Sequence, residues 1–268
     1  MSGPIELTPL DLAMAAALIL ANAGVSLALD LRLGRRLALA AIRSVVQLSL
    51  LGWLLKYIFA ANGPLPVIVL MLVMATLAGT EAVRRTSRRV RGMTLVSTAV
   101  MLCTSLLVAF YGVGFILEVD PWWKPQYIIP ILGMILGNAL NGVSLGLETT
   151  LEGFVKDRDI VESLLAHGAT RQEASHDIVK RSVRTGTIPI LNAMIAAGLI
   201  SIPGMMTGQI LAGEDPVSAA HYQMFILFSI TGAVALGTIG VVKLTARLVF
   251  DDRDRLRIDR ITQPNSSK

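Results

Sequence analysis

Long apolar windows without a charged residue dominate the sequence of this chain. Six of them lie at residues 12–29, 57–80, 92–117, 125–147, 187–213 and 216–242. A helix that crosses a bilayer needs about 20 predominantly apolar residues. The pattern therefore predicts an all-α, polytopic membrane protein with about seven transmembrane helices, near residues 10–30, 37–58, 65–82, 92–117, 125–147, 187–212 and 217–243.

The composition excludes an ordinary soluble domain. Of the 268 residues, 53% are hydrophobic and 16% are charged, whereas a soluble domain carries roughly 25% charged residues. The formal net charge of +5 does not indicate nucleic acid as a partner, because the basic residues are spread over several loops. Cys103 is the single cysteine, so the chain forms no internal disulfide and no thiolate cage for a metal.

The basic residues predict how the chain is oriented in the lipid bilayer. With the N-terminus outside, all of the 24 Lys and Arg residues except Arg43, Lys56 and Lys124 fall in inner loops or in the C-terminal tail. Cytoplasmic loops carry an excess of Lys and Arg. The chain is therefore expected to be N-out and C-in, with a transmembrane domain at 1–250 and a frayed cytoplasmic tail at 251–268.

A charged stretch at 148–186 is expected on the cytoplasmic side. Apolar residues at 160, 161, 164 and 165 recur at helical spacing, and Gly168 permits a turn before a second helix. Two interpretations stay open. Segments of this type in ATP-binding cassette (ABC) importer permeases dock into a groove on the ATPase, whereas many amphipathic helices lie at a membrane surface without a partner. The candidate coupling residues are Glu162, Leu165, Gly168, Ala169, Thr170, Glu173 and Ala174.

The fifth predicted helix combines small residues with amides. Gly133 and Gly137 form one small-xxx-small pair and Gly142 and Gly146 form another, and such pairs let helix backbones approach closely. Asn138 and Asn141 lie near them, as does Met134. An amide in lipid needs a partner, so these residues either hold helices together or line a pathway.

The sixth predicted helix is interrupted by Pro189, Pro203 and several glycines, as in transporters where broken helices line a cavity. Met205 and Met206 lie beside the interruption, where they either bind a soft metal or pack as apolar residues. Asn192 and Gln209 are the further polar candidates in this helix.

Arg43 and Gln47 lie one turn apart in the second predicted helix. A charge within the membrane is a functional candidate by default. Arg43 could instead form a structural ion pair with Glu81, and Glu81 could equally pair with Arg84 or Arg85 in its own helix.

No catalytic motif is present. The chain lacks GxxxxGK[ST], so it does not build a phosphate-cradling loop for ATP, and it lacks HExxH and GxSxG. The three histidines are scattered. We therefore expect no enzyme activity on this chain, no cofactor bound by it, and no metal site that the sequence can identify.

Five segments resemble the permeases of the FetB-type iron-export ABC transporters, a group that also includes plant aluminium-sensitivity membrane proteins. The segments are IRSVVQLSLLGWLL at 42–55, MATLAGTEAVRR at 74–85, PQYIIPILGMILGNALNGVSLGLE at 125–148, LAHGATRQEA at 165–174 and IPILNAMIAAGLISIPGMMTGQILAGEDPVSAAHYQ at 188–223.

The resemblance implies a permease subunit in the cell inner (cytoplasmic) membrane. It would pair with a separate ATPase subunit that binds ATP and Mg, with two copies of each. In bacterial members the implied cargo is iron leaving the cytosol, and in plant members a nucleotide-sugar. The candidate pathway residues are Arg43, Gln47, Glu81, Met134, Asn138, Asn141, Asn192, Met205, Met206 and Gln209.

Two other classes remain as alternatives. A secondary transporter or channel that needs no ATPase would carry carboxylates or histidines within the membrane for ion coupling, and the predicted spans are poor in both apart from Glu81. A membrane scaffold or receptor would transport nothing.

Overall fold

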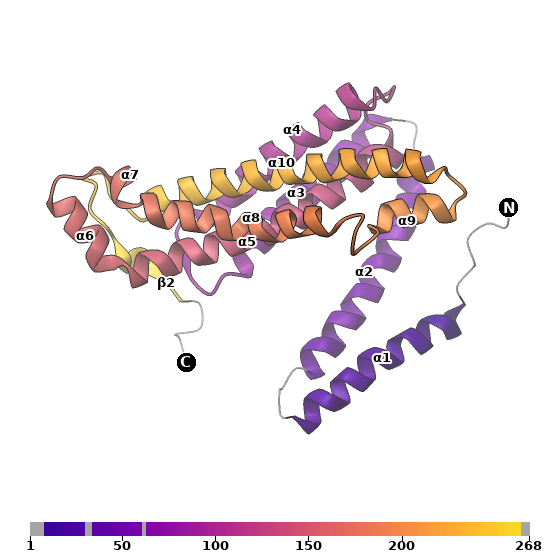
Figure 1. Cartoon of the computed structure of the whole chain (residues 1–268), viewed down its shortest axis with the longest axis horizontal. Coiled ribbons are helices and arrows are strands. Elements are labelled where there is room, and N and C mark those ends of the chain that lie inside the picture. The colour runs from indigo at the N-terminus through magenta and orange to yellow at the C-terminus, as the bar shows by residue number, and fades with distance from the viewer. Residues whose placement is uncertain (1–7, 30–33, 61–62, 264–268) are drawn as a thin grey trace.

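The computed structural model describes residues 8–29, 34–60 and 63–263; Arg32 of the first predicted inner loop and residues 264–268 of the tail lie outside this part. The long helices are α1 (Pro9–Ala28), α2 (Gly34–Ala60), α3 (Pro64–Arg84), α4 (Met93–Phe110), α5 (Pro125–Lys156), α8 (His176–Ala196) and α10 (Pro216–Leu248). The short ones are α6 (Arg158–Ala166), α7 (Arg171–Ala174), α9 (Gly204–Leu211), a π-helical turn at Tyr111–Ile116 and a 3-10 turn at Ile258–Arg260. Strands β1 (Arg89–Val90) and β2 (Ile261–Thr262) pair antiparallel, and the all-α class is confirmed (Figure 1).

Five helices in the described part of the chain are long and apolar enough to cross a membrane. They are Leu37–Ala60, Pro64–Arg84, Met93–Ile116, Pro125–Lys156 and Pro216–Leu248. The apolar part of α1, Leu10–Ser26, is shorter, and the sixth predicted span is divided between α8 and α9. A polytopic membrane protein is therefore confirmed, while the count of seven spans and the N-out orientation stay predictions.

Two predicted helix boundaries are wrong. The fifth helix was expected to end at 147, but α5 continues to Lys156, and the sixth was expected to begin at 187, but α8 begins at His176. Hydropathy marks where a helix leaves the apolar layer, whereas backbone hydrogen bonds continue the helix into water. The two helices therefore extend well beyond their charge-free windows.

The interruption of the sixth helix is confirmed between residues 197 and 203. Ala197 is extended, Gly198 has a φ of 82°, and Pro203 is extended directly before α9. Pro189, by contrast, lies inside α8 and does not end it. The left-handed conformation at Gly198 and the missing N–H of Pro203 together account for the position of the break.

The helices pack around α5, which contacts α3, α4, α8 and α10. At the closest point, a Cβ on Gly142 would lie 2.7 Å from the carbonyl oxygen of Gly186 and 2.8 Å from Cγ1 of Val234. Gly142 and Gly146 therefore make the close approach expected of a small-xxx-small pair. The expectation is wrong for Gly133 and Gly137, since a Cβ on Gly137 would meet nothing within 4 Å.

The hairpin of α1 and α2 stands apart from this bundle (Figure 1). Leu54, Leu55 and Ile58, near the end of α2, pack against the core. The first half of α2 leaves the bundle, so Arg43 and Gln47 are exposed.

The tail is not frayed as far as residue 263. The Asp251 carboxylate accepts hydrogen bonds from the backbone N–H groups of Arg253 and Arg255. Together with the neighbouring Arg255 guanidinium, these two bonds lower the pKa of Asp251 to about 2. The ring of Phe250 packs edge-to-face on the ring of Phe154, with the ring centroids 5.7 Å apart. The tail therefore folds back, and β2 reaches β1 in the loop after α3.

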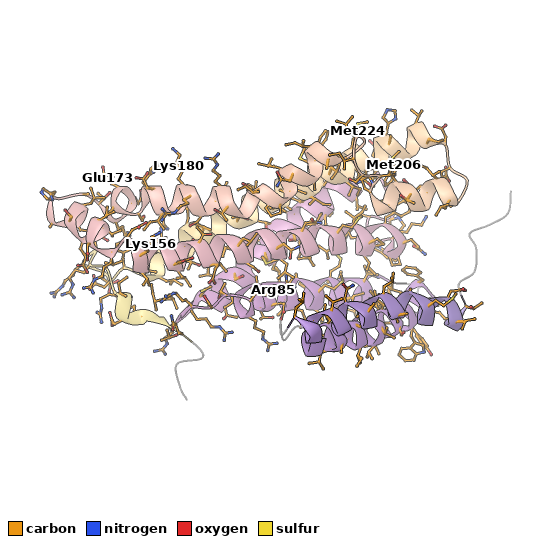
Figure 2. All side chains as sticks on the ribbon, turned by 60° about the horizontal axis from the view of Figure 1, so that its bottom comes forward. Arg85, Lys156, Glu173, Lys180, Met206 and Met224 are labelled. Atoms are coloured by element: carbon orange, nitrogen blue, oxygen red, sulfur yellow. The ribbon has the colours of Figure 1, made fainter. Side chains whose placement is uncertain are left out.

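Most of the inner segments predicted from charge gather at one end of the molecule, which we call the basic end. It contains the α3–α4 loop, the tip of the α5–α8 hairpin and the tail. Figure 2 shows Lys156, Glu173 and Lys180 at this end and Met206 and Met224 at the opposite end. Three of the four predicted inner segments thus lie together, whereas the start of α2, with Arg35 and Arg36, belongs to the hairpin that stands apart from the bundle (Figure 1).

The packing at Gly142 and Gly186 gives a stability prediction. In Gly186→Ala the new Cβ would lie 2.5 Å from the Gly142 carbonyl oxygen and 2.7 Å from Cγ2 of Thr238. We expect a loss of about 1–3 kcal/mol, the usual cost of overpacking, measured as a lower thermal unfolding midpoint in detergent. Gly137→Ala is the control and should not lower the midpoint. Equal loss in both variants would contradict this account of the packing.

Candidate functional site

A polar face joins the basic end of α3 to the middle of α5. The Arg85 guanidinium donates a hydrogen bond to Oδ1 of Asn141 at 2.9 Å, and Nε of Arg85 lies 3.7 Å from Oε1 of Glu81. All three side chains keep contact with solvent. Two predicted pathway residues, Glu81 and Asn141, are therefore brought together through Arg85. Arg85 is labelled in Figure 2 and shows where this face lies.

The same face continues to Glu148, which the sequence analysis did not select. Its carboxylate accepts hydrogen bonds from the backbone N–H of Ser87 at 2.8 Å and from the Ser87 hydroxyl. These bonds tie the loop after α3 to α5. The available signal was the position of Glu148 as the first charged residue after a charge-free window.

Asn138 and Met134 lie farther along α5 and are half-buried. The Asn138 amide donates to the backbone carbonyl of Met134 at 2.9 Å, within its own helix. Asn138 is therefore satisfied locally, whereas Asn141 connects two helices. The interpretation of these amides as contacts between helices fits Asn141 alone.

Arg43 and Gln47 do not join this polar face. The possible Arg43–Glu81 ion pair is absent, and Glu81 pairs within its own helix, with Arg85. Arg43 has no hydrogen-bond or ion-pair partner within the described residues. A charged group within an apolar helix is a candidate functional residue by default, so Arg43 stays a candidate without a partner among the described residues.

The remaining pathway candidates surround the break between α8 and α9. Met205 packs partly against the core, Met206 is half-buried, and Asn192 is exposed. The Oε1 atom of Gln209 is buried without a hydrogen-bond partner. Across the described residues, no three His, Cys, Asp or Glu side chains gather in a way that could hold a metal ion, so a metal-ligand set is not assigned.

The predicted coupling segment forms the tip of the hairpin made by α5 and α8 (Figure 1). Gly168 adopts a φ of 90° and turns the chain between α6 and α7. Thr170 and Glu173 form a reciprocal capping box at the start of α7. The hydrogen bonds from Thr170 lower the pKa of Glu173, so the cap is complete above the ordinary pKa of a Glu and is lost as the pH falls through the lowered one.

Helix α6 presents one apolar side to the protein and another to solvent. Val161 is buried and Leu165 packs against the core, as does Ala174 of α7. Ile160 and Leu164, one turn apart, are 62% and 41% exposed. Glu162 pairs with Arg158 at 2.8 Å on the polar side, and Ala169 is half-buried in the turn. The tip therefore carries an apolar pair that the described part of the chain does not cover, and both interpretations of the segment, ATPase docking and a helix at the membrane surface, remain open.

Comparisons with known proteins place these features in a family. The model of the Uncharacterised protein family (UPF0014) matches residues 9–250. A UPF0014 membrane protein of Synechocystis is 32% identical over 85% of this chain and 88% of its own. The probable iron export permease protein FetB of Escherichia coli is 29% identical over 82% of this chain and 83% of its own.

A plant relative is also similar. The protein ALUMINUM SENSITIVE 3 of Arabidopsis thaliana is 32% identical over 74% of this chain and 71% of its own. No solved structure matches the chain. The resemblance that the sequence motifs indicated is thereby confirmed at the level of the family.

The two amides of α5 give a prediction for the polar face. Asn141→Ala removes the acceptor for the Arg85 guanidinium, and we expect a loss of about 1 kcal/mol in unfolding free energy, the size of a solvent-exposed hydrogen bond to a charge. Asn138→Ala removes a bond within one helix and should change stability by about 0.5 kcal/mol or less. Thermal unfolding in detergent measures both. A larger loss for Asn138→Ala would contradict the assignment of Asn141 as the link between helices.

Proposed function

This chain belongs to the UPF0014 family of membrane proteins, and from that premise we propose that it is the transmembrane permease subunit of an ABC-type transporter that exports iron. Its partner would be a separate ATPase subunit that binds ATP and Mg. The observation that carries the proposal is the tip of the α5–α8 hairpin, with its exposed Ile160 and Leu164.

The tip has the geometry that force transmission requires. Helices α5 and α8 pack along their lengths and run from the apolar layer to α6 and α7 without interruption at the membrane surface. A displacement applied at α6 is therefore carried into the layer by two continuous helices. The candidate coupling residues between Glu162 and Ala174 would form the contact with the ATPase.

Alternating access would use the break at 197–203 and the polar face. Helix α9 follows α8 through a hydrogen-bonded turn at 197–201, in which Leu199, Ile200 and Ser201 donate to the Ala196 carbonyl, and through the extended Pro203. The hydrogen bonds of this turn lie within residues 196–201, so α9 would move relative to α8 about residues 202 and 203. The pathway would lie along Glu81, Asn141 and Asn138, with Asn192 and the methionines of α9 nearer the opposite end.

Two copies of the permease would complete the transporter. The exposed half of α2 supports this, since Arg43 and Gln47 lie on an apolar helix and face no other part of the described chain. A second permease would offer them polar partners. The assembly would be a multi-pass complex of the cell inner membrane, with two permeases and two ATPase subunits.

Iron is the proposed cargo because FetB is named as a probable iron export permease. Glu81 and Glu148 are the carboxylates beside the proposed pathway, and no cage of carboxylates gathers among the described residues, so iron would contact single oxygen ligands in turn rather than bind in a closed site. The alternative cargoes are another divalent metal and a nucleotide-sugar.

The apolar pair on α6 gives the test of ATPase docking. In the double variant Ile160→Glu and Leu164→Glu we expect at least about tenfold less ATPase subunit to co-purify from co-expressing cells, because charges replace apolar contacts at an interface centre. Arg253→Glu makes the same change of two charge units on the exposed tail, outside the candidate coupling segment, and is the control that should keep the ATPase subunit bound. Undiminished co-purification of the double variant would exclude α6 from the interface.

The cargo is tested with the reconstituted pair of subunits in vesicles. We expect ATP-dependent flux of ferrous iron, and less flux of other divalent metals and of a nucleotide-sugar. Flux that continues without the ATPase subunit would indicate a secondary transporter. ATP-dependent flux of the sugar alone would contradict iron as the cargo while keeping the ABC assignment.

A further inference from the structure

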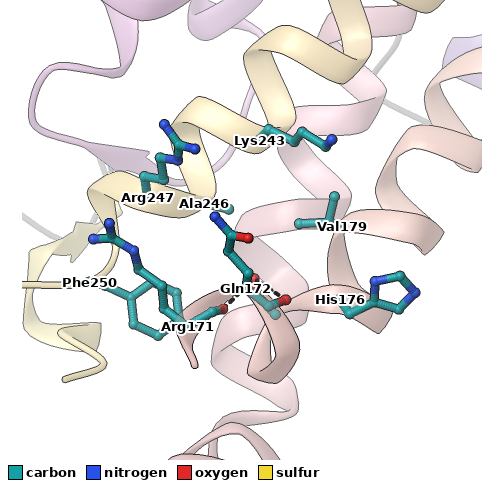
Figure 3. A pocket seen from close by; sticks show the side chains of 9 residues that line it. Arg171, Gln172, His176, Val179, Lys243, Ala246, Arg247 and Phe250 are labelled. Carbon is teal, nitrogen blue, oxygen red and sulfur yellow. Dashed lines mark hydrogen bonds between the residues drawn. The ribbon is translucent and has the colours of Figure 1, made fainter. Parts of the chain in front are cut away.

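A basic cavity lies at the basic end, between α7, the start of α8 and the end of α10. Its volume is about 230 Å³, and its lining includes Arg171, His176, Lys243 and Arg247. Figure 3 shows these side chains around the cavity, with Phe250 on one wall. A second cavity of about 540 Å³ shares Arg171 and Arg247 and adds Arg91 and Arg260 to the lining.

Most of the positive charge in the first cavity is not neutralised by the protein. Arg171 forms an ion pair with Asp254 at 3.3 Å. Lys243 and Arg247 have no carboxylate within ion-pair distance among the described residues. Two aspartates line the second cavity: Asp251 pairs with Arg255, and Asp252 forms no ion pair with Lys243 or Arg247 among the described residues. Two neighbouring cations without a counter-ion favour a bound anion.

The cavity lies where α10 leaves the apolar layer. Lys243 is the first charged residue after the charge-free window 216–242. Arg247 follows one turn later on the same side of the helix. The polar headgroup region extends only several ångströms beyond the hydrocarbon core, so these two side chains lie at the depth of lipid phosphates.

An apolar stripe on α10 runs from the cavity into the layer. Leu236 and Ile239 precede Lys243 at helical spacing and share its face. They are 51% and 37% exposed, and a Cβ on Gly232, one turn farther, would meet nothing within 4 Å. The face is therefore uncovered by the described chain, apolar toward the membrane and cationic toward the basic end.

We infer that this face binds an anionic phospholipid, with its phosphate held by Lys243 and Arg247 in the cavity and an acyl chain along Ile239 and Leu236. A free phosphate would use the cations but not the stripe, and a zwitterionic lipid would use the stripe but leave the net positive charge uncompensated. Basic pockets between transmembrane helices on the cytoplasmic side recognise anionic headgroups. The inference depends on the membrane location and not on the cargo. Because Arg171 and Gln172 of the proposed ATPase contact also line the cavity, co-purification of the ATPase subunit is measured beside lipid binding.

The test is native mass spectrometry of the purified full chain in detergent, titrated with phosphatidylglycerol or phosphatidylcholine. The double variant Lys243→Gln and Arg247→Gln should bind phosphatidylglycerol about 30-fold more weakly, at about fivefold for each cation near an anionic lipid. The control removes two exposed cations of the same end, Lys156→Gln and Arg253→Gln, and should retain binding. The charge-preserving pair Lys243→Arg and Arg247→Lys should also retain it.

Four results would overturn the inference. The first is an equal loss of binding in the control variant, and the second is an equal affinity of the unaltered chain for phosphatidylcholine. The third is full displacement of phosphatidylglycerol by inorganic phosphate at equal concentration. The fourth is a double variant that loses co-purification of the ATPase subunit while its lipid affinity is unchanged. The last would assign the cavity to a protein interface. Saturable binding confined to phosphatidylglycerol and lost only in the double variant supports it.

Discussion

The close approach of α5, α8 and α10 is the contact on which the rest of the structure depends. At Gly142 and Gly186 the two backbones come so near that neither position has room for a Cβ, and Thr238 of α10 lies against both. Lipid tails are as apolar as the side chains they surround, so helices in a bilayer associate through such packing rather than through the hydrophobic effect. Small residues at this point set the distance between α5, α8 and α10.

The projecting hairpin follows from that packing. Because α5 and α8 are held side by side within the layer, they remain paired where they leave it, and Ile178 of α8 fills the space beside Gly153 of α5. The tip formed by α6 and α7 is then fixed by Gly168, by the capping box of Thr170 and Glu173, and by the Arg171–Asp254 ion pair with the tail. A partner that binds the tip therefore acts on the packed centre of the bundle.

Several polar residues outside this centre divide into two groups. Glu81, Arg85, Asn141 and Glu148 satisfy one another or a neighbouring loop across α3 and α5. Arg43, Lys243 and Arg247 have no carboxylate partner in the described chain. A charged side chain in the apolar layer or at its edge is stabilised by a partner, so the second group marks the surfaces at which we propose that a second permease or a lipid binds.

The sequence by itself determined the class of the protein and the grouping of most of its loops, because hydropathy and the distribution of Lys and Arg are properties of the chain that the bilayer reads directly. It also marked 189–213 as a stretch rich in interrupting residues, but Pro189 and Pro203 both lack an N–H, and only the structure shows that the break lies at 197–203. Only the tertiary structure decided which glycine pair packs closely against another helix. It also decided which asparagine links two helices and which carboxylate pairs with Arg85. Gly133 and Gly142 begin identical motifs, and only the presence of α8 and α10 beside Gly142 distinguishes them. The tail likewise looks unstructured in sequence, and it is ordered by contacts with β1 and Phe154 that lie far from it along the chain.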